Sequence, residues 1–353
     1  MVYANRAMKS LSLLFTMLVV LTPLSAELKS GPLLPHQVVK NWAQLPKGWN
    51  FGESSGVAVD RNDNVWVFNR GPHPVIEFDK NGKMLQSWGE NTFNSSHGIR
   101  VDADGNIWTI DVKGHAVMKF DPAGRLQMIL GRQTVIGRPT TAGNDSSKDA
   151  FNEPTNIAFA KNGDFFVSDG YINSRVVRFG PNGQYLAHWG RKGTGDGEFN
   201  LVHDVVLDKA GRVYVADRTN ERVQIFNQDG KFLGKWTDIG APWGLDYVAR
   251  EDAIYMCDGK NNRILKLNLE GQVLGSATLE SCRASWILRT ASPSTAPALF
   301  TSSRSRIGAC RSSSHPPAQD GRTHLINTAA PSLGSSSPGC TNCNRRVRCE
   351  VIL

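Results

Sequence analysis

Residues 98–112 read GIRVDADGNIWTIDV, two short runs of alternating apolar and polar residues on either side of the turn sequence Asp-Ala-Asp-Gly. Alternation with a period of two around such a turn is typical of a β-hairpin. A third run, VMKF at 117–120, leads into a second turn sequence, Asp-Pro-Ala-Gly. The segment therefore predicts a small antiparallel sheet.

The same pattern returns at a period of about 40–50 residues, which is typical of propellers and solenoids. The other copies are GVAVDRNDNVWVFNR from Gly56, NIAFAKNGDFFVSDG from Asn156, DVVLDKAGRVYVADR from Asp204 and GLDYVAREDAIYMCDG from Gly244. Several copies close on a further apolar stretch that ends in Trp-Gly or Leu-Gly and supplies a fourth strand. A four-stranded sheet cannot bury its faces alone, and radial packing around an axis solves this problem. We therefore predict an all-β fold, a β-propeller with five recognisable blades.

Two segments lie outside this repeat. Val38 to Gln44 is expected to add an outer strand to the final blade and so help to close the ring. Residues 132–151 separate the second and third copies and are rich in Thr, Gly, Asn and Asp. This composition predicts a long loop at the rim of the propeller.

The first 26 residues have the pattern of an export signal. Arg6 and Lys9 precede an almost wholly apolar run at 11–21, and Pro23 comes before the small-residue sequence Leu-Ser-Ala at 24–26. The run is shorter than the roughly 20 residues of a spanning helix, so a single membrane anchor is the less favoured alternative. We expect a secreted or periplasmic protein, a monomer without a membrane span once the signal is removed.

Composition changes abruptly near residue 281. The last 73 residues hold nine Arg, five of the six Cys and no Lys. Such a shift is typical of a low-complexity, disordered tail. The competing hypothesis is translation in a neighbouring reading frame, because synonymous codons for residues 285–311 can spell a further copy of the repeat. The chain thus divides into a signal (1–26), a propeller (27–280) and a tail (281–353) that is disordered or out of frame, which the coding DNA would decide.

The tail also holds most of the charge. The whole chain carries +8 and the tail alone +7, so the propeller is close to neutral. A basic groove for nucleic acid is therefore not expected.

One position of the repeat, here called the axial slot, directly precedes the innermost strand. Equivalent residues of each blade ring the central channel of a propeller. In a six-bladed ring, a third histidine in blade six would join those of blades two and four in a three-imidazole set with an open position, the arrangement of catalytic zinc. The shifted frame places a histidine there, whereas the alternative is that both present histidines are ordinary hydrogen-bonded channel residues. The five axial slots hold Ser55, His97, Thr155, His203 and Trp243.

Three residues that do not repeat follow the second strand of their blades, namely Arg70, Tyr171 and Arg218. Together on one face of the ring, the two guanidinium groups would bind a carboxylate and lower the pKa of the phenol, which would make Tyr171 a usable general base. Each Arg taken alone fits a solvated loop equally well. The residue that ends this strand recurs in every blade, which indicates a structural turn role for Asn69, Asp111, Asp169, Asp217 and Asp258.

These motifs resemble those of the peptidyl-α-hydroxyglycine α-amidating lyase family, whose members are NHL-type six-bladed propellers. The resemblance is strong over about residues 50–230 and weaker to about 275. Its most specific parts are the stretches HGIRVDADGNIW at 97–108 and VSDGYINSR at 167–175, together with GEFNLVHDVVL at 197–207. The chain is thus expected to be an NHL-type propeller with five recognisable blades of an expected six.

The resemblance implies cleavage of the C–N bond of a small peptide substrate, a peptidyl-α-hydroxyglycine, to a peptide amide and glyoxylate. It places a catalytic Zn²⁺ on three histidines, two of which fall on His97 and His203. It implies Tyr171 as the catalytic base, with Arg70 and Arg218 holding the substrate carboxylate or supporting the tyrosinate. It also implies a structural Ca²⁺ on the backbone carbonyls of Val57 and Ile99, because this ion prefers hard oxygen ligands.

The chain departs from the family in two places. It lacks the third histidine and a sixth copy of the repeat, which would impair activity, and Ile172 stands where animal members have a disulfide cysteine. The alternative function is a non-catalytic NHL propeller that binds peptides or glycans at its rim. A calcium-dependent hydrolase of the lactonase type would need several acidic or amide oxygens at the axis, where this chain has His, Ser and Thr.

Overall fold

The computed structural model describes residues 28–36, 38–39, 41–131, 147–148, 150–278, 299–302 and 349–352. The expected signal at 1–26, most of the loop at 132–151 and most of the tail lie outside the described residues. The described part holds no helix that could span a membrane.

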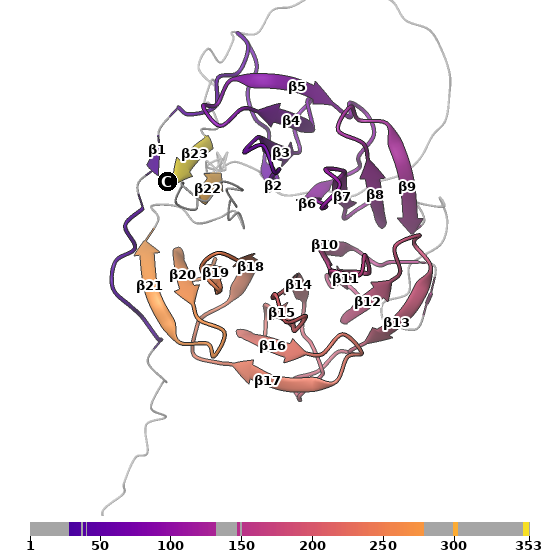
Figure 1. The fold of residues 1–353 in the computed structure, drawn as a ribbon, viewed down its shortest axis with the longest axis vertical. Coiled ribbons are helices and arrows are strands. Elements are labelled where there is room, and N and C mark those ends of the chain that lie inside the picture. The colour runs from indigo at the N-terminus through magenta and orange to yellow at the C-terminus, as the bar shows by residue number, and fades with distance from the viewer. Residues whose placement is uncertain are drawn as a thin grey trace, which may run out of the picture.

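Five four-stranded antiparallel sheets surround a common axis, which confirms the β-propeller (Figure 1). Blades one and two consist of β2 (Ser54–Val59), β3 (Val65–Asn69), β4 (Val75–Phe78), β5 (Met84–Trp88), β6 (Ser96–Val101), β7 (Ile107–Asp111), β8 (Ala116–Phe120) and β9 (Leu126–Gly131). Blades three to five consist of β10 (Pro154–Phe159), β11 (Phe165–Asp169), β12 (Arg175–Phe179), β13 (Tyr185–Trp189), β14 (Val202–Leu207), β15 (Val213–Asp217), β16 (Arg222–Phe226), β17 (Phe232–Trp236), β18 (Pro242–Val248), β19 (Ala253–Asp258), β20 (Arg263–Leu267) and β21 (Val273–Thr278). The first strand of each blade faces the axis and the fourth lies at the circumference.

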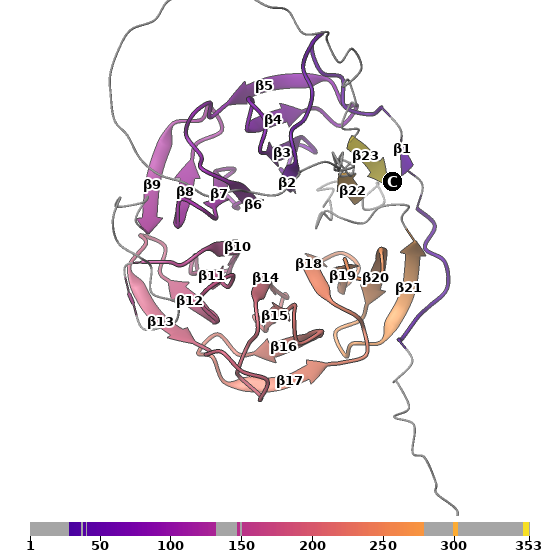
Figure 2. The ribbon, with the colours of Figure 1, turned by 180° about the vertical axis from the view of Figure 1, so that it is seen from behind.

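A three-stranded sheet occupies the sector between blades five and one. Its order is β1-β23-β22, formed by β1 (Val38–Val39), β23 (Cys349–Ile352) and β22 (Leu299–Ser302). Before β1, Leu33 bridges Ser276 of β21, and after it Gln44 bridges Lys83 beside β5. The N-terminal segment therefore runs along the outside of blades five and one (Figure 2). Of the predicted outer strand Val38–Gln44, only Val38–Val39 form a strand, and they pair with β23 in the sector between these blades.

The core lies between neighbouring blades. Trp66 and Phe68 of blade one pack against Ile107 and Met118 of blade two, and each interface carries a comparable apolar cluster. Because both faces of a blade are covered by its neighbours, the second strands are buried at every position. This packing fixes the radial direction in which each innermost strand presents its side chains.

The residue that ends the second strand of each blade organises the loops at one end of the ring. In blade two, Asp111 accepts backbone hydrogen bonds from Asn94, Ser95 and Gly114 at 2.7–2.9 Å. Asn69, Asp169, Asp217 and Asp258 accept equivalent bonds in the other blades. The predicted structural turn role is confirmed, since these groups hold the loops that carry the candidate site.

Candidate active site

The two axial-slot histidines face each other across the channel. His97 comes from β6 and His203 from β14, and both are buried, at 7% and 4% exposure. Their ring centroids lie 5.1 Å apart with the planes at 64°. The expected convergence of imidazoles from alternate blades is therefore present in the structure.

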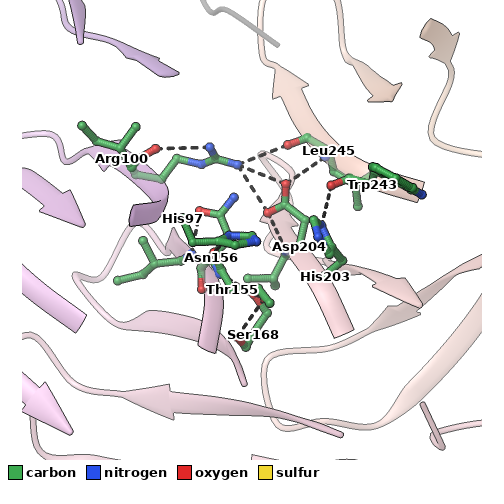
Figure 3. Close-up of polar contacts among 12 residues, drawn as sticks. His97, Arg100, Thr155, Asn156, Ser168, His203, Asp204, Trp243 and Leu245 are labelled. Carbon is green, nitrogen blue, oxygen red and sulfur yellow. Dashed lines mark hydrogen bonds and ion pairs between the residues drawn. The ribbon is translucent and has the colours of Figure 1, made fainter. Parts of the chain in front are cut away.

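Backbone carbonyls fix the tautomer of both imidazoles. Nδ1 of His97 lies 2.7 Å from the carbonyl oxygen of Thr155, and Nδ1 of His203 lies 2.6 Å from that of Trp243 (Figure 3). A carbonyl only accepts, so each Nδ1 carries the hydrogen and each Nε2 presents a lone pair. Burial lowers the pKa of His97 to about 4 and that of His203 well below its ordinary value. Both rings are therefore neutral at physiological pH.

The hydroxyl of Tyr171 lies where the two lone pairs meet. Its oxygen is 3.2 Å from Nε2 of His97 and 3.1 Å from Nε2 of His203. One hydroxyl proton can satisfy only one of two acceptors. The channel thus holds one more nitrogen lone pair than this hydroxyl can satisfy.

This donor set fits part of a zinc site. Zinc binds neutral imidazole nitrogens, and its histidine ligands commonly donate the other ring N–H to a carbonyl, as both do here. Within the described residues no group of three or more His, Cys, Asp or Glu side chains is placed to hold a metal. The structure therefore contains two of the three expected ligands, each in the tautomer that zinc requires, and the chain has no sixth copy of the repeat to supply the third.

Equivalent positions, in the loops after the second strands of blades three, one and four, are occupied by Tyr171, Arg70 and Arg218. Their backbone N–H groups donate to the carbonyls of Glu153, Glu53 and Leu201 respectively, each two residues before an axial slot. Sequence position alone did not show this equivalence, because Gly170 adds one residue before Tyr171. The three side chains therefore belong to one face of the ring, as expected.

The two arginines are held differently. Arg218 stacks on the indole of Trp243, with its guanidinium carbon 3.9 Å from the ring centroid, and interacts with the Tyr171 hydroxyl. Arg70 donates through Nε to the carbonyl of Ser96 at 3.0 Å and pairs with Glu53 at 3.1 Å. Arg218 therefore lies within the site and Arg70 at its more exposed edge.

The expected lowering of the Tyr171 pKa is wrong for the protein without a metal. Burial raises the pKa of the phenol, and the positive charges of Arg218 and Arg70 offset only part of this effect. The sequence showed the charges but not the desolvation. Formation of a tyrosinate near neutral pH thus needs more positive charge than the two arginines supply.

Gly170 lets the Tyr171 loop approach blade four. A Cβ at this position would overlap the backbone carbonyl of Val202, directly before His203. We expect Gly170→Ala to lower the free energy of unfolding by about 1–3 kcal/mol, as overpacking does, and to shift Tyr171. Urea denaturation of this variant beside Gly234→Ala, where a Cβ meets no atom within 4 Å, tests the effect. Equal stabilities would show that the approach is not required.

Thr155 and Trp243 are functional neighbours that sequence reasoning did not assign. They fill the axial slots of the blades that follow each histidine, so the repeat predicts their position near the axis. Their contribution comes from backbone carbonyls, which a pattern of residue types does not show. Glu53, the partner of Arg70, was also missed, because one acid in a loop gives no signal.

One of the two carbonyls expected to bind calcium is already engaged. The carbonyl of Ile99 lies 3.3 Å from the guanidinium of Arg100, while Val57 is buried in β2. The axis at this level therefore contains a fixed organic cation, and the residues do not fit a Ca²⁺ ion in the expected place.

Comparison with known proteins links the chain to NHL repeats and to amidating enzymes. The NHL repeat family model matches residues 199–226. NHL repeat-containing protein 3 from Homo sapiens is 32% identical over 234 residues, covering 65% of this chain and 66% of that protein. Peptidyl-glycine alpha-amidating monooxygenase A from Xenopus laevis is 35% identical over 246 residues, covering 59% of this chain and 25% of that protein. The probable peptidyl-alpha-hydroxyglycine alpha-amidating lyase of Caenorhabditis elegans is 30% identical over 176 residues, covering 49% and 36%.

The chain thus spans only part of each of these relatives. Among solved structures, a gluconolactonase from Xanthomonas campestris superposes with a TM-score of 0.54 at 15% identity, covering 77% of this chain and 88% of that one. Streptogramin B lyase gives 0.53 at 13% identity, covering 75% and 80%. At such identities the likeness extends to the propeller fold alone.

Proposed function

Because the chain belongs to the NHL-repeat family of β-propellers, and its relatives include an amidating lyase and amidating monooxygenases, we propose that it is an exported, zinc-dependent lyase. Its substrates would be small peptides that end in α-hydroxyglycine. The reaction breaks the bond between the amide nitrogen and the hydroxyl-bearing carbon and gives a peptide amide and glyoxylate. One observation carries the proposal: the Tyr171 hydroxyl meets Nε2 of both His97 and His203 at one point of the channel.

Each part of the site has a role in this reaction. His97 and His203 would hold zinc through Nε2, and the bound ion would supply a Lewis acid to the substrate hydroxyl. The Tyr171 oxygen removes the proton of that hydroxyl. The C–O bond then becomes the aldehyde carbonyl of glyoxylate, and the C–N electron pair leaves with the nitrogen, which takes up a proton.

The arginines divide the remaining work. Arg218 lies beside the Tyr171 oxygen and favours its ionised form, since an opposite charge lowers a phenol pKa. Arg70 lies at the exposed edge beside Ser96 and Glu53, where its guanidinium can bind the substrate carboxylate. Because both imidazoles are neutral, they do not attract the carboxylate, which is left to Arg70.

A second candidate function rests on the ligand count. With two histidines and no third metal-binding side chain placed beside them in the described residues, the same face would act as a non-catalytic peptide-binding surface. Arg70 and Arg218 would then hold a C-terminal carboxylate without any reaction. The metal content of the protein distinguishes the two functions.

The test is zinc binding by the purified full chain. We expect His97→Ala to weaken zinc affinity at least about tenfold, because a ligand contributes no less than an outer-shell partner does. Zinc bound after equilibrium dialysis, measured by mass spectrometry of the metal, and glyoxylate released from a peptidyl-α-hydroxyglycine should fall together. His188→Ala is the matched control, because His188 lies on the outer strand β13 and bonds to Tyr185.

Unchanged zinc binding in His97→Ala would overturn the zinc assignment and favour the peptide-binding function. Zinc loss without any lyase activity in the wild type would overturn the proposed substrate while leaving the metal site intact.

A further inference from the structure

Three blades direct oxygen atoms at one region of the axis, beside the histidines (Figure 3). They are the carbonyl of Ile99 in β6, the carboxylate of Asp204 in β14 and the carbonyl of Leu245 in β18 (Figure 3). Hard oxygen ligands in such a group attract a cation, and calcium is the ion that they suit.

The cation in this place is a side chain. The Arg100 guanidinium lies 3.3 Å from the Ile99 and Leu245 carbonyl oxygens and 3.4 Å from both oxygens of Asp204. These distances are at the long end for hydrogen bonds, so several weak contacts and the charge hold the group together. A guanidinium stays charged at every physiological pH, and its donors can address several oxygens at once.

Asp204 is preformed as the anionic partner. Its side chain is 4% exposed, and its oxygens accept backbone hydrogen bonds from Val205 at 2.7 Å and from Leu245 at 2.9 Å. A buried carboxylate that is fixed in this way needs a nearby positive charge. Arg100 supplies it from blade two and so links blades two, four and five across the axis.

A calcium ion in the same place would meet both a steric and an electrostatic obstacle. The guanidinium already fills the space between the oxygens, and a divalent ion a few ångströms from it would be repelled. Calcium would also need six to eight oxygen ligands, and the oxygens present here already face Arg100.

We propose that the Arg100 guanidinium takes the place of the axial structural calcium, so that blades two, four and five are linked at this level of the axis without a calcium ion. The inference does not depend on the proposed lyase function, since Arg100 takes no part in the reaction. It predicts that Arg100 alone makes the thermal stability of this chain independent of calcium.

The experiment uses full-length protein stripped of all metals, so that zinc does not contribute. Adding CaCl₂ should leave the Tm of the wild type unchanged, and titration calorimetry should detect no calcium binding. Arg100→Ala should lower the Tm by at least about 5 °C, because it leaves Asp204 buried without its cation. In that variant CaCl₂ should raise the Tm by on the order of 5 °C, because the vacated oxygens now face an empty space.

Arg61→Ala is the matched control, since Arg61 lines the same mouth of the channel as Arg100 but is exposed. It should change neither the Tm nor the calcium response. A calcium-dependent rise in the wild-type Tm would overturn the proposal even if Arg100→Ala failed to fold. Equal Tm values for Arg100→Ala and Arg61→Ala would overturn it as well.

Discussion

A Tyr171→Phe variant should release glyoxylate from a peptidyl-α-hydroxyglycine about 10²–10⁴-fold more slowly than the wild type, because the group that removes the substrate proton is lost. The phenyl ring keeps its packing, since the Tyr171 ring lies edge-on to both imidazoles with centroids 5.4 and 5.6 Å away. Only the oxygen that bridges the two Nε2 atoms disappears. The Tm and the zinc content should therefore stay close to those of the wild type.

The chain offers a matched control for this substitution. The hydroxyl of Tyr185 also forms a hydrogen bond with a histidine, His188, at 2.6 Å, but both residues lie on the outer strand β13. Tyr185→Phe should leave the turnover number unchanged. If Tyr171→Phe retains activity within about threefold of the wild type, Tyr171 is not the base and the roles proposed for the channel site are wrong.

The comparison of the two variants also bears on the unusual pKa of the phenol. Burial raises the Tyr171 pKa, so without further positive charge the hydroxyl stays protonated and cannot act as a base. Activity that depends on Tyr171 and on zinc together would show that the two arginines and the metal jointly overcome this burial. The arginines alone do not.

Much of this architecture could be predicted because it is periodic. Strand alternation and turn residues repeat in every blade, so aligning the copies places His97 and His203 in equivalent slots. Radial packing then converts an equivalent slot into an equivalent distance from the axis. The same symmetry identified Asp111 and its counterparts as turn residues, which their backbone hydrogen bonds confirm.

The features that escaped prediction depend on groups that a residue pattern does not display. The tautomers of the histidines are fixed by backbone carbonyls of the next slot, at Thr155 and Trp243. The raised pKa of Tyr171 follows from burial, whereas the sequence showed only the neighbouring charges. Arg100 occupies a polar position of an alternating strand, which normally indicates solvent, but both faces of an innermost strand lie inside the ring.

The turn residues that organise the site also lead to the largest expected effect on stability. Arg175 and Asp169 form an ion pair at 2.9 Å in which both side chains are almost completely buried, at 1% and 0% exposure. The same guanidinium donates to the carbonyls of Ser147 at 2.6 Å and Ala150 at 2.8 Å. The pair thus ties the loop before blade three to the turn that leads into Tyr171.

Arg175→Ala should lower the free energy of unfolding by about 3–5 kcal/mol, because it leaves a buried carboxylate without its charge partner. Burial already raises the pKa of Asp169, and Arg175 opposes this rise. Without the arginine the folded-state pKa rises further above the unfolded value. A carboxyl group whose pKa is raised by folding destabilises the folded state once the pH exceeds its pKa in the unfolded chain. The loss of unfolding free energy in Arg175→Ala should therefore be large at neutral pH and smaller near about pH 4.

Urea denaturation of the wild type and the variant at both pH values measures this deficit. Arg125→Ala is the control, because Arg125 pairs with Asp121 at 2.6 Å while its own side chain is 79% exposed. Solvent screens such a pair, so its loss should leave the unfolding midpoint nearly unchanged at either pH. A deficit in Arg175→Ala that did not shrink at the lower pH would mean that lost packing, rather than the stranded Asp169 carboxylate, destabilises the variant.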